Sequence, residues 1–204
     1  MNVEFWFDPI CPFCWMTSRW INRVAPERDL AIEWRPISLL FKNGMDADHP
    51  FHAKASRTRN LLRVVESVRA AGHADRIGEL YTAFGTCIHL RGETEFDVAE
   101  VLTEVGLDPV HAGALDDESF DDTIRAAMAD GLSLTGNDVG TPIIAIEGRA
   151  GRAGVFGPVI TKLPALDDAL RLWDGFVALV ETDGFFELKR TRTAGPDMST
   201  IPSG

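Results

Sequence analysis

The chain has 204 residues, enough for one sizeable domain or for one domain with an insertion. Its hydrophobic fraction of 45% is ordinary for a globular protein and too high for a disordered one. Its 31 acidic and 20 basic residues give a formal net charge of −11, which disfavours nucleic acid or an anionic membrane as the main partner, because both require a basic surface.

The N-terminal residues have a pattern typical of a parallel βαβ unit. Residues 2–7 are largely apolar and predict a buried strand. Residues 12–26 predict a helix, because their apolar side chains recur at helical spacing and a proline lies near the end. Residues 30–39 alternate well enough to predict a second strand, so the order of strand, helix and strand indicates a parallel pair with a helical crossover.

The interval from residue 41 to residue 137 has helical patterns throughout and is too long for a simple loop. Residues 95–106 and 118–130 predict two of its helices. Two further apolar stripes at helical spacing are formed by Leu61, Val65 and Val68, and by Ile77, Leu80, Tyr81 and Phe84. The interval is therefore expected to be an all-helical insertion.

The strand pattern resumes after the helical interval. Residues 143–146 predict a strand, and residues 147–154, with three glycines and two arginines, predict the loop of a hairpin whose partner strand begins at Val155. Residues 164–181 predict a last amphipathic helix. Residues 194–204 are expected to form a flexible tail.

Cys11-Pro12-Phe13-Cys14 lies between the first predicted strand and the first predicted helix. Two cysteines three residues apart at a helix start share one face and are close enough to form a disulfide. The N–H groups and partial positive charge of a helix N-terminus stabilise a thiolate, which predicts that Cys11 is reactive near neutral pH. Pro12 suits the first helical turn, where its missing N–H costs nothing. We interpret the motif as a redox-active dithiol; a zinc knuckle and an inert buried thiol pair are the alternatives.

Thr141-Pro142 directly precedes the strand predicted at residues 143–146. The arrangement resembles thioredoxin-like folds, in which a cis-proline at this point packs against the two cysteines and the residue before it faces the sulfurs. Cis peptide bonds are rare outside X-Pro pairs, so Thr141-Pro142 is the natural candidate.

Three other residues have two interpretations each. Trp15 could line the site or pack beneath the first helix, and His89 could contact a thiol co-substrate or be satisfied by the backbone. Cys87 is expected to be a small core residue, and a third redox thiol is the alternative. A zinc site formed by Cys87 and His89 with Cys11 and Cys14 is disfavoured, because nothing in the spacing supports it.

The chain resembles DsbA-type members of the thioredoxin superfamily, and more narrowly the mycothiol-dependent nitroreductase group. The segments that carry the resemblance are residues 5–9, 15–20, 80–83, 88–89, 138–142, 156–159, 172–174 and 185–193. The resemblance implies an α/β, thioredoxin-like fold of the DsbA type. Its core would comprise residues 1–40 and 138–193, and its all-helical insertion residues 41–137.

The resemblance also implies a cytosolic thiol–disulfide oxidoreductase in which Cys11 is the nucleophile and Cys14 resolves the mixed disulfide. The substrate would contact Pro12, Phe13, Trp15, His89, Thr141 and Pro142. Mycothiol or another small thiol would supply electrons as a co-substrate, a nitro compound or a disulfide would receive them, and no tightly bound cofactor or metal is expected. Members of the group carry Trp where this chain has Phe13, a position that lines the site and tunes the redox potential.

Two other classes of protein are alternatives to this function. The first is a glutathione-transferase-kappa or isomerase-like enzyme on the same fold, although such enzymes generally place Ser where Cys11 lies. The second is a metal-stabilised binding module, which metal analysis of the purified protein would separate from an enzyme.

The sequence also predicts the setting of the protein. No secretory leader is visible, no stretch is long enough to cross a membrane, and three cysteines make no disulfide framework, so a cytosolic location is expected. A homodimer is expected, because five tryptophans exceed what one small core buries comfortably. Lys189, Arg190 and Arg192 form a basic run that is either a solvated face or an anchor for a thiol's carboxylate or a partner subunit.

Overall fold

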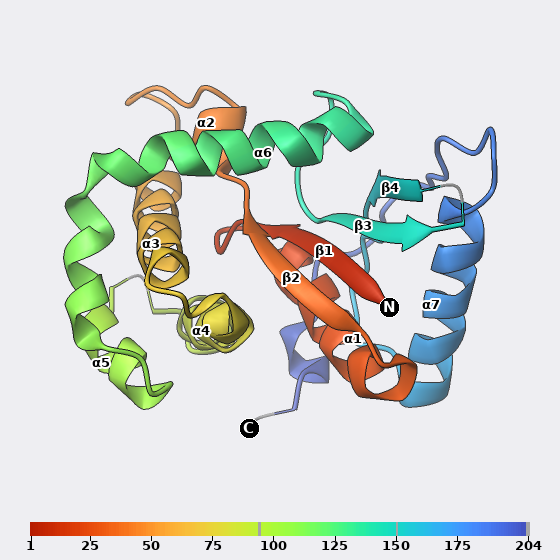
Figure 1. The fold of residues 1–204 in the computed structure, drawn as a ribbon, viewed down its shortest axis with the longest axis horizontal. Helices are drawn as coiled ribbons and strands as arrows, with labels where there is room; N and C mark the ends of the chain where they lie inside the picture. The colour runs from red at the N-terminus through yellow and green to blue at the C-terminus, as the bar shows by residue number, and fades with distance from the viewer. Residues whose placement is uncertain (94, 150, 203–204) are drawn as a thin grey trace.

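A computed structural model describes residues 1–93, 95–149 and 151–202 and has a four-stranded mixed sheet at its centre (Figure 1). The strand order is β2-β1-β3-β4. Strand β1 (Asn2–Phe7) pairs in parallel with β2 (Ala31–Pro36) and antiparallel with β3 (Ile143–Gly148), which pairs antiparallel with β4 (Gly151–Phe156). Segments far apart in the sequence therefore meet at β1, the strand that leads into the two cysteines.

The helices lie on both faces of the sheet and beside its β2 edge (Figure 1). Their bounds are α1 Pro12–Arg28, α2 Leu39–Lys42, α3 His52–Ala70, α4 Ile77–Gly85, α5 Val98–Glu104, α6 Asp121–Thr135 and α7 Leu166–Val180. A π-helical turn, Thr86–Leu90, extends α4, and short 3₁₀ segments occur at Ala74–Arg76, Pro109–Asp116, Glu118–Phe120 and Met198–Thr200. The interval between β2 and β3 thus has the helical content that the sequence predicts.

The first helix is longer than predicted. It passes through Pro26 and ends at Arg28, because Asp29 then adopts a left-handed conformation with φ of 49°. The N–H of Leu30 returns to the carbonyl of Ala25 at 3.0 Å and closes the last turn. This end is a hydrogen-bonded cap, which the position of the proline alone does not reveal.

The predicted hairpin loop at residues 147–154 is too long, because β3 continues to Gly148 and β4 begins at Gly151. The glycines that suggested a loop belong to the strands. A Cβ atom on Gly154 would lie 2.9 Å from the Cδ1 atom of Leu134, so this glycine lets α6 pack directly on β4.

Two hydrophobic clusters hold the layers together. The larger one joins the sheet to α1, α3, α4 and α7, and the smaller one joins the other face to α6 through Trp6, Ile37, Leu132, Ile143 and Ala145. The indole N–H of Trp6 donates to the carbonyl of Ala127 at 2.8 Å. Gly131 leaves room for this indole, since a Cβ atom there would lie 2.8 Å from the ring nitrogen. Helix α6 is therefore fixed on the sheet directly behind β1.

The segment after Thr193, expected to be flexible, contacts the loop before α7. The N–H of Asp197 donates to the carbonyl of Thr161 at 2.7 Å, and the N–H of Leu163 donates to the Thr200 hydroxyl at 3.0 Å. Met198 and Ile201 pack against the main core. These contacts attach the described part of the tail to the fold.

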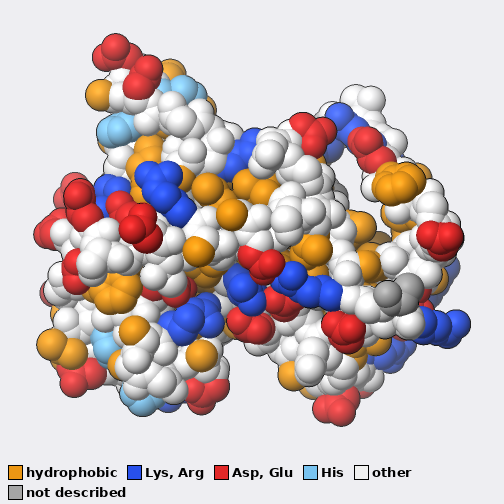
Figure 2. Space-filling model, turned by 45° about the horizontal axis from the view of Figure 1, so that its top comes forward, with side chains coloured by type: hydrophobic (Ala, Val, Ile, Leu, Met, Phe, Trp, Pro, Cys, Tyr) orange, Lys and Arg blue, Asp and Glu red, His pale blue; other side chains and the backbone are white. Residues whose placement is uncertain are grey.

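Acidic and basic side chains intermingle on the face shown in Figure 2. Glu4 and Asp130 form ion pairs with Arg35 and Arg152, whose guanidinium groups also lie over the ring of Trp6 at 5.3 and 5.6 Å from its centroid. Along the part of the chain that the structure describes, the helices all fall short of the length and apolarity needed to cross a membrane.

A buried ion pair joins α3 to α6 within the helical interval. The guanidinium of Arg63, only 3% exposed, donates to both carboxylate oxygens of Asp121 at 2.7 and 2.8 Å, and Arg59 donates to the same carboxylate at 3.1 Å. Burial raises the pKa of Asp121, but the hydrogen bonds and charges of these arginines outweigh it and hold the pKa below its usual value.

We expect Asp121→Asn to lower the free energy of unfolding at pH 7 by about 3 kcal/mol, because the buried charge of Arg63 keeps only the exposed carboxylate of Glu118, 3.5 Å away, as a partner. Urea unfolding followed by circular dichroism measures the change. The control is Asp168→Asn, whose partner Arg171 lies 3.4 Å away with both side chains more than 70% exposed. That variant should lose about 0.5 kcal/mol or less.

The pH dependence of this loss has a defined sign. Because the folded-state pKa of Asp121 lies below its unfolded value, the pair stabilises the protein fully above about pH 4 and loses this effect as the pH falls through the folded-state pKa. The difference between wild type and Asp121→Asn should therefore shrink toward pH 3. A difference that stays constant down to that pH would contradict this account.

Candidate active site

The first cysteine caps the helix that follows β1. Asp8 and Pro9 form the connecting turn, in which an Asp8 carboxylate oxygen accepts the N–H of Ile10 at 3.0 Å and its carbonyl accepts the N–H of Cys11 at 3.1 Å. The Cys11 sulfur accepts the N–H of Cys14 at 3.4 Å, as an N-capping oxygen does in other helices. The sulfur therefore lies at the positive end of α1.

The two sulfurs have different environments. Cys11 is half-buried, whereas Cys14 is 0% exposed and its thiol donates to the carbonyl of Trp6 at 3.7 Å. Both cysteines are free thiols in this structure. Cys11 is therefore the more accessible residue of the pair, and Cys14 is shielded from solvent.

Thr141 and Pro142 lie beside the Cys11 sulfur, as the sequence predicts. The Thr141-Pro142 peptide bond is cis, and the Cys11 thiol donates to the Thr141 carbonyl at 3.7 Å. A second cis bond, Gly157-Pro158, was not anticipated. The Thr17 hydroxyl donates to the Pro158 carbonyl at 2.7 Å, which attaches this second loop to α1.

The pKa of Cys11 differs from the expectation that the helix N-terminus makes this thiol reactive near neutral pH. Burial raises the pKa of Cys11, although the side chain of Thr141 and the N–H of Cys14 act in the opposite direction. Burial and the nearby Cys11 sulfur raise the pKa of Cys14 well above its usual value. The helix N-terminus favours the Cys11 thiolate as expected, but burial outweighs it. Cys11 remains the better candidate nucleophile because it is the more exposed and the less strongly shifted of the two.

Asp8 is a functional candidate that the sequence analysis missed. Its side chain is 0% exposed, and burial raises its pKa to about 6. The second carboxylate oxygen accepts the N–H of Leu39, the first residue of α2, at 2.7 Å. Its negative charge also raises the pKa of Cys11. The position of Asp8 in a turn after a strand is a signal, but it is a common one.

His89 contacts the loop before Cys11 and not the sulfurs. It lies on the π-helical turn, and its Nε2 is 2.8 Å from the carbonyl of Pro9, which assigns the proton to that nitrogen. Burial lowers the pKa of His89 to about 4, so the ring is neutral at pH 7. His89 can therefore hold the cysteine loop in place.

Trp15 packs beneath the first helix, as the second of the two interpretations of this residue predicts. Its side chain is 1% exposed, with the ring of His89 stacked on it at 5.8 Å and the ring of Tyr81 edge-on at 5.5 Å. A side chain in this position supports α1 and does not present a surface to a substrate.

Cys87 is 3% exposed and belongs to the main hydrophobic cluster, as expected for a core cysteine. Over residues 1–93, 95–149 and 151–202, no group of three or more His, Cys, Asp or Glu side chains is arranged to hold a metal ion.

The rim of the site includes a residue from the C-terminal segment. Pro12 and Phe13 are half-buried, and the guanidinium of Arg192 lies over the ring of Phe13 at 4.5 Å from its centroid. Arg192 belongs to the basic run that was considered as an anchor for an anionic group, and the structure places this member of the run at the dithiol.

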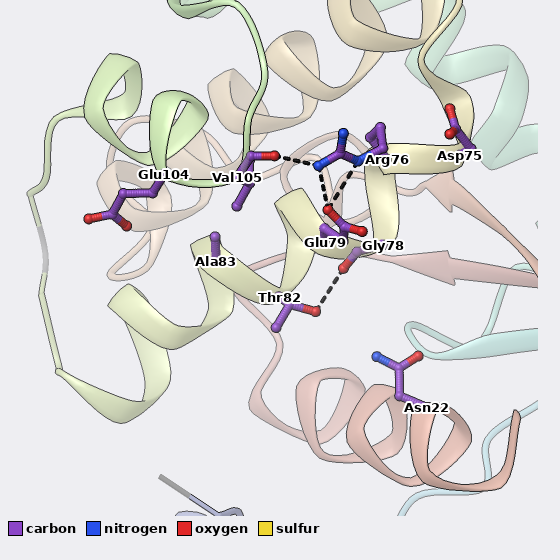
Figure 3. Close-up of a pocket in the computed structure, with 9 residues that line it drawn as sticks. All are labelled: Asn22, Asp75, Arg76, Gly78, Glu79, Thr82, Ala83, Glu104 and Val105. Atoms are coloured by element: carbon purple, nitrogen blue, oxygen red, sulfur yellow. Dashed lines mark hydrogen bonds and ion pairs between the residues drawn. The ribbon is translucent and has the colours of Figure 1, made fainter. Parts of the chain in front are cut away.

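A surface hollow of about 640 Å³ lies among α1, α4 and α5 (Figure 3). It is lined by Asn22, Asp75, Arg76, Gly78, Glu79, Thr82, Ala83, Glu104 and Val105. The guanidinium of Arg76 is engaged by Glu79 and the carbonyl of Val105 (Figure 3). In the described part of the chain, the residues that line this hollow include none of the predicted site residues, so the dithiol site lies elsewhere.

Known proteins share this fold and sequence pattern. The family model described as "Rv2466c-like: Mycothiol-dependent nitroreductase Rv2466c" matches residues 10–190. The uncharacterized protein Rv2286c of Mycobacterium tuberculosis is 30% identical over 197 residues, which are 94% of this chain and 83% of that protein.

Two solved structures show the fold. The probable DsbA oxidoreductase SCO1869 of Streptomyces coelicolor has a TM-score of 0.55 at 19% identity, covering 95% of this chain and 94% of that one. The cytosolic disulfide reductase DsbM of Pseudomonas aeruginosa, which has also been solved with GSH, has a TM-score of 0.59 at 15% identity, covering 88% of this chain and 100% of that one. The predicted thioredoxin-like fold of the DsbA type, with its helical insertion, is confirmed.

We expect Gly85→Ala to destabilise the protein by about 1–3 kcal/mol, because the added Cβ atom would overlap the Cε3 and Cζ3 atoms of the buried Trp15 ring. Urea unfolding measures the loss. The control is Gly175→Ala in α7, where no atom of the described residues apart from its own helical surroundings lies within 4 Å of the new Cβ. This control should be neutral or stabilised by about 0.5–1 kcal/mol. Equal stabilities of the two variants would show that Trp15 does not fill the space as described.

We expect Cys11 to be alkylated before Cys14 and Cys87 when the reduced protein meets limiting iodoacetamide at pH 8. The reason is exposure, since Cys11 is half-buried and the other two are buried, together with the larger pKa increase of Cys14. Peptide mapping by mass spectrometry locates the label, and Cys11→Ser is the control that should remove the fast phase. Faster labelling of either buried cysteine would refute the assignment of the nucleophile.

Proposed function

We propose that this chain, which belongs to the Rv2466c-like family of mycothiol-dependent nitroreductases, is a thiol–disulfide oxidoreductase that works through Cys11 and Cys14. One observation carries the proposal: the sulfur of Cys11, a half-buried residue, accepts the N–H of Cys14, while Cys14 is fully buried. A dithiol reductant requires one sulfur that reaches the substrate and a second, shielded sulfur that attacks afterwards.

The reaction proceeds by two exchanges. The Cys11 thiolate attacks one sulfur of a substrate disulfide, a Cys11–substrate bond forms, the substrate's own S–S bond breaks, and the departing thiolate takes up a proton. Cys14 then loses its proton and attacks the Cys11 sulfur, which forms the Cys11–Cys14 disulfide and releases the second thiolate. The dithiol has given up two electrons and the substrate has gained them. The N–H of Cys14, 3.4 Å from the Cys11 sulfur, stabilises the thiolate that begins the sequence.

A small thiol regenerates the dithiol in this proposal. Two molecules of the thiol reduce the Cys11–Cys14 disulfide and leave as their own disulfide. The name of the family favours mycothiol, and DsbM, a structural neighbour solved with GSH, supports a small thiol partner in general terms. Reduction of a nitro compound belongs to the same proposal: the dithiol becomes a disulfide, and the nitro group takes two electrons and two protons to give a nitroso group and water.

The remaining parts of the proposal concern setting and substrate. The cytosolic location and the homodimer stay predictions. The half-buried ring of Phe13 and the guanidinium of Arg192 above it supply the rim against which a substrate would lie. An aromatic ring and a cation side by side suit a substrate that combines a planar or apolar part with a polar or anionic one.

We expect Cys14→Ser to accumulate a stable adduct between Cys11 and the small thiol. The variant is incubated with the oxidised form of mycothiol or of glutathione, and intact-mass spectrometry should show the mass of one bound thiol. Wild type should pass through this species and release it, because Cys14 resolves it. Cys11→Ser is the control and should form no adduct. If Cys14→Ser reduces disulfides at the wild-type rate, a monothiol route must replace the proposed mechanism.

A further inference from the structure

The interior behind the cysteines contains buried polar atoms without partners. Among the described residues, four buried side-chain atoms have no hydrogen-bond partner: Trp15 Nε1, Arg19 Nη2, Tyr81 Oη and Thr141 Oγ1. Each of these groups can donate a hydrogen bond. Leaving one such donor buried and unpaired costs about 1–3 kcal/mol, so a group of them in one place calls for an explanation.

The Tyr81 ring packs against two residues that adjoin Cys14 and its hydrogen-bond partner. Tyr81 is 0% exposed, its ring stacks on Phe7 at 4.1 Å, and Trp15 meets it edge-on at 5.5 Å. Phe7 follows the residue whose carbonyl accepts the Cys14 thiol, and Trp15 follows Cys14 itself. Burial raises the pKa of Cys14 well above its usual value, and the Tyr81 side chain acts in the opposite direction.

Arg19 adds a positive charge beside Trp15. Its guanidinium lies over the Trp15 ring at 3.9 Å from the centroid, and its Nε donates to the Ser18 hydroxyl at 3.2 Å. Burial lowers the pKa of Arg19 to about 10, so the group is still a cation at pH 7. Within the part of the chain that the structure describes, Arg19 makes no ion pair with a carboxylate. A cation in this position favours a negative charge nearby, and the neighbours whose charges act on it are Tyr81 and Cys14.

We infer that the unpaired donors stabilise the thiolate of Cys14. In this inference the Tyr81 hydroxyl donates a hydrogen bond to the thiolate, and Arg19 is a positioning residue that adds positive charge through this cluster. The inference rests on the proposed function, because it concerns the step in which Cys14 resolves the mixed disulfide. A thiol or a disulfide carries no negative charge, so the donors gain most when the thiolate is present. That difference lowers the barrier of the resolving step.

The bonds and protons balance without another reagent. Cys14 gives its proton to the solvent and attacks the Cys11 sulfur; the Cys11–Cys14 bond forms, the bond from Cys11 to the substrate sulfur breaks, and the departing thiolate takes up a proton. Tyr81 keeps its proton throughout, since burial and the charge of Cys14 raise its pKa well above the usual value. Its contribution is a hydrogen bond to the thiolate.

Tyr81→Phe tests the inference, because it removes the hydroxyl and preserves the stacking on Phe7. Reduced protein is mixed with glutathione disulfide, quenched with acid, and the Cys11 mixed disulfide is followed by mass spectrometry across pH 6–9. We expect formation of the adduct at the wild-type rate and decay slowed about tenfold at pH 7, since a hydrogen bond to a charged group has this magnitude. Arg19→Met should slow the same step, and Arg19→Lys should restore part of the rate.

The control is Thr82→Val, which removes the hydroxyl of the next residue on α4. That hydroxyl donates to the Gly78 carbonyl at 2.7 Å in the surface hollow among α1, α4 and α5 (Figure 3). It should change neither step. Decay at the wild-type rate in Tyr81→Phe would overturn the inference. An equal slowing of formation and decay would overturn it too, because that result indicates a structural role. If wild type itself forms no adduct on Cys11, the proposed function fails instead.

Discussion

The buried carboxylate of Asp8 is the interaction on which the position of the dithiol depends. One of its oxygens holds the N–H of Ile10 in the loop before Cys11, and the other holds the N–H of Leu39, where the chain turns from β2 into the helical interval. A carboxylate without access to water is costly, and its pKa of about 6 reflects that cost. Two backbone N–H groups offset part of it. The same group therefore joins the end of β1, the start of α1 and the first residue of α2, and it does so directly beside the sulfurs.

The helical interval completes the site that the sheet and α1 begin. The cysteines and the cis-proline loop belong to the central sheet and its first helix, whereas His89 and Tyr81 come from α4 and the π-helical turn that extends it. His89 holds the loop at Pro9, and Tyr81 packs against Phe7 of β1 and Trp15 of α1. Variation within the interval can thus alter the environment of the sulfurs without changing either cysteine. The paired arginines and carboxylate between α3 and α6 keep this added layer in one arrangement.

Features that depend on local pattern were predictable from the sequence. The order of strands and helices, the helical interval and the burial of Cys87 each follow from spacing or residue type within a short window, whereas the cis bond at Pro142 was implied by the resemblance to thioredoxin-like folds. Features that depend on packing between distant segments were not. The hairpin was misjudged because Gly154 makes room for Leu134, which belongs to another element. The direction of the Cys11 pKa was misjudged because burial depends on everything packed around the sulfur. Tyr81 has the same spacing as its apolar neighbours, so its hydroxyl gave no separate signal.

The π-helical turn at Thr86–Leu90 restricts how this chain can change in length. A π-turn contains one more residue than an α-turn, and each residue of a helix turns the chain by about 100°. Deleting a single residue between Thr86 and Leu90 would restore ordinary α-helical geometry and redirect the side chains of the turn, so the imidazole of His89 would leave the carbonyl of Pro9. Substitutions in this turn change one side chain at a time, whereas a deletion changes the directions of several side chains of the turn at once. Relatives that share the contact at Pro9 should therefore tolerate many residue types here but keep the same number of residues.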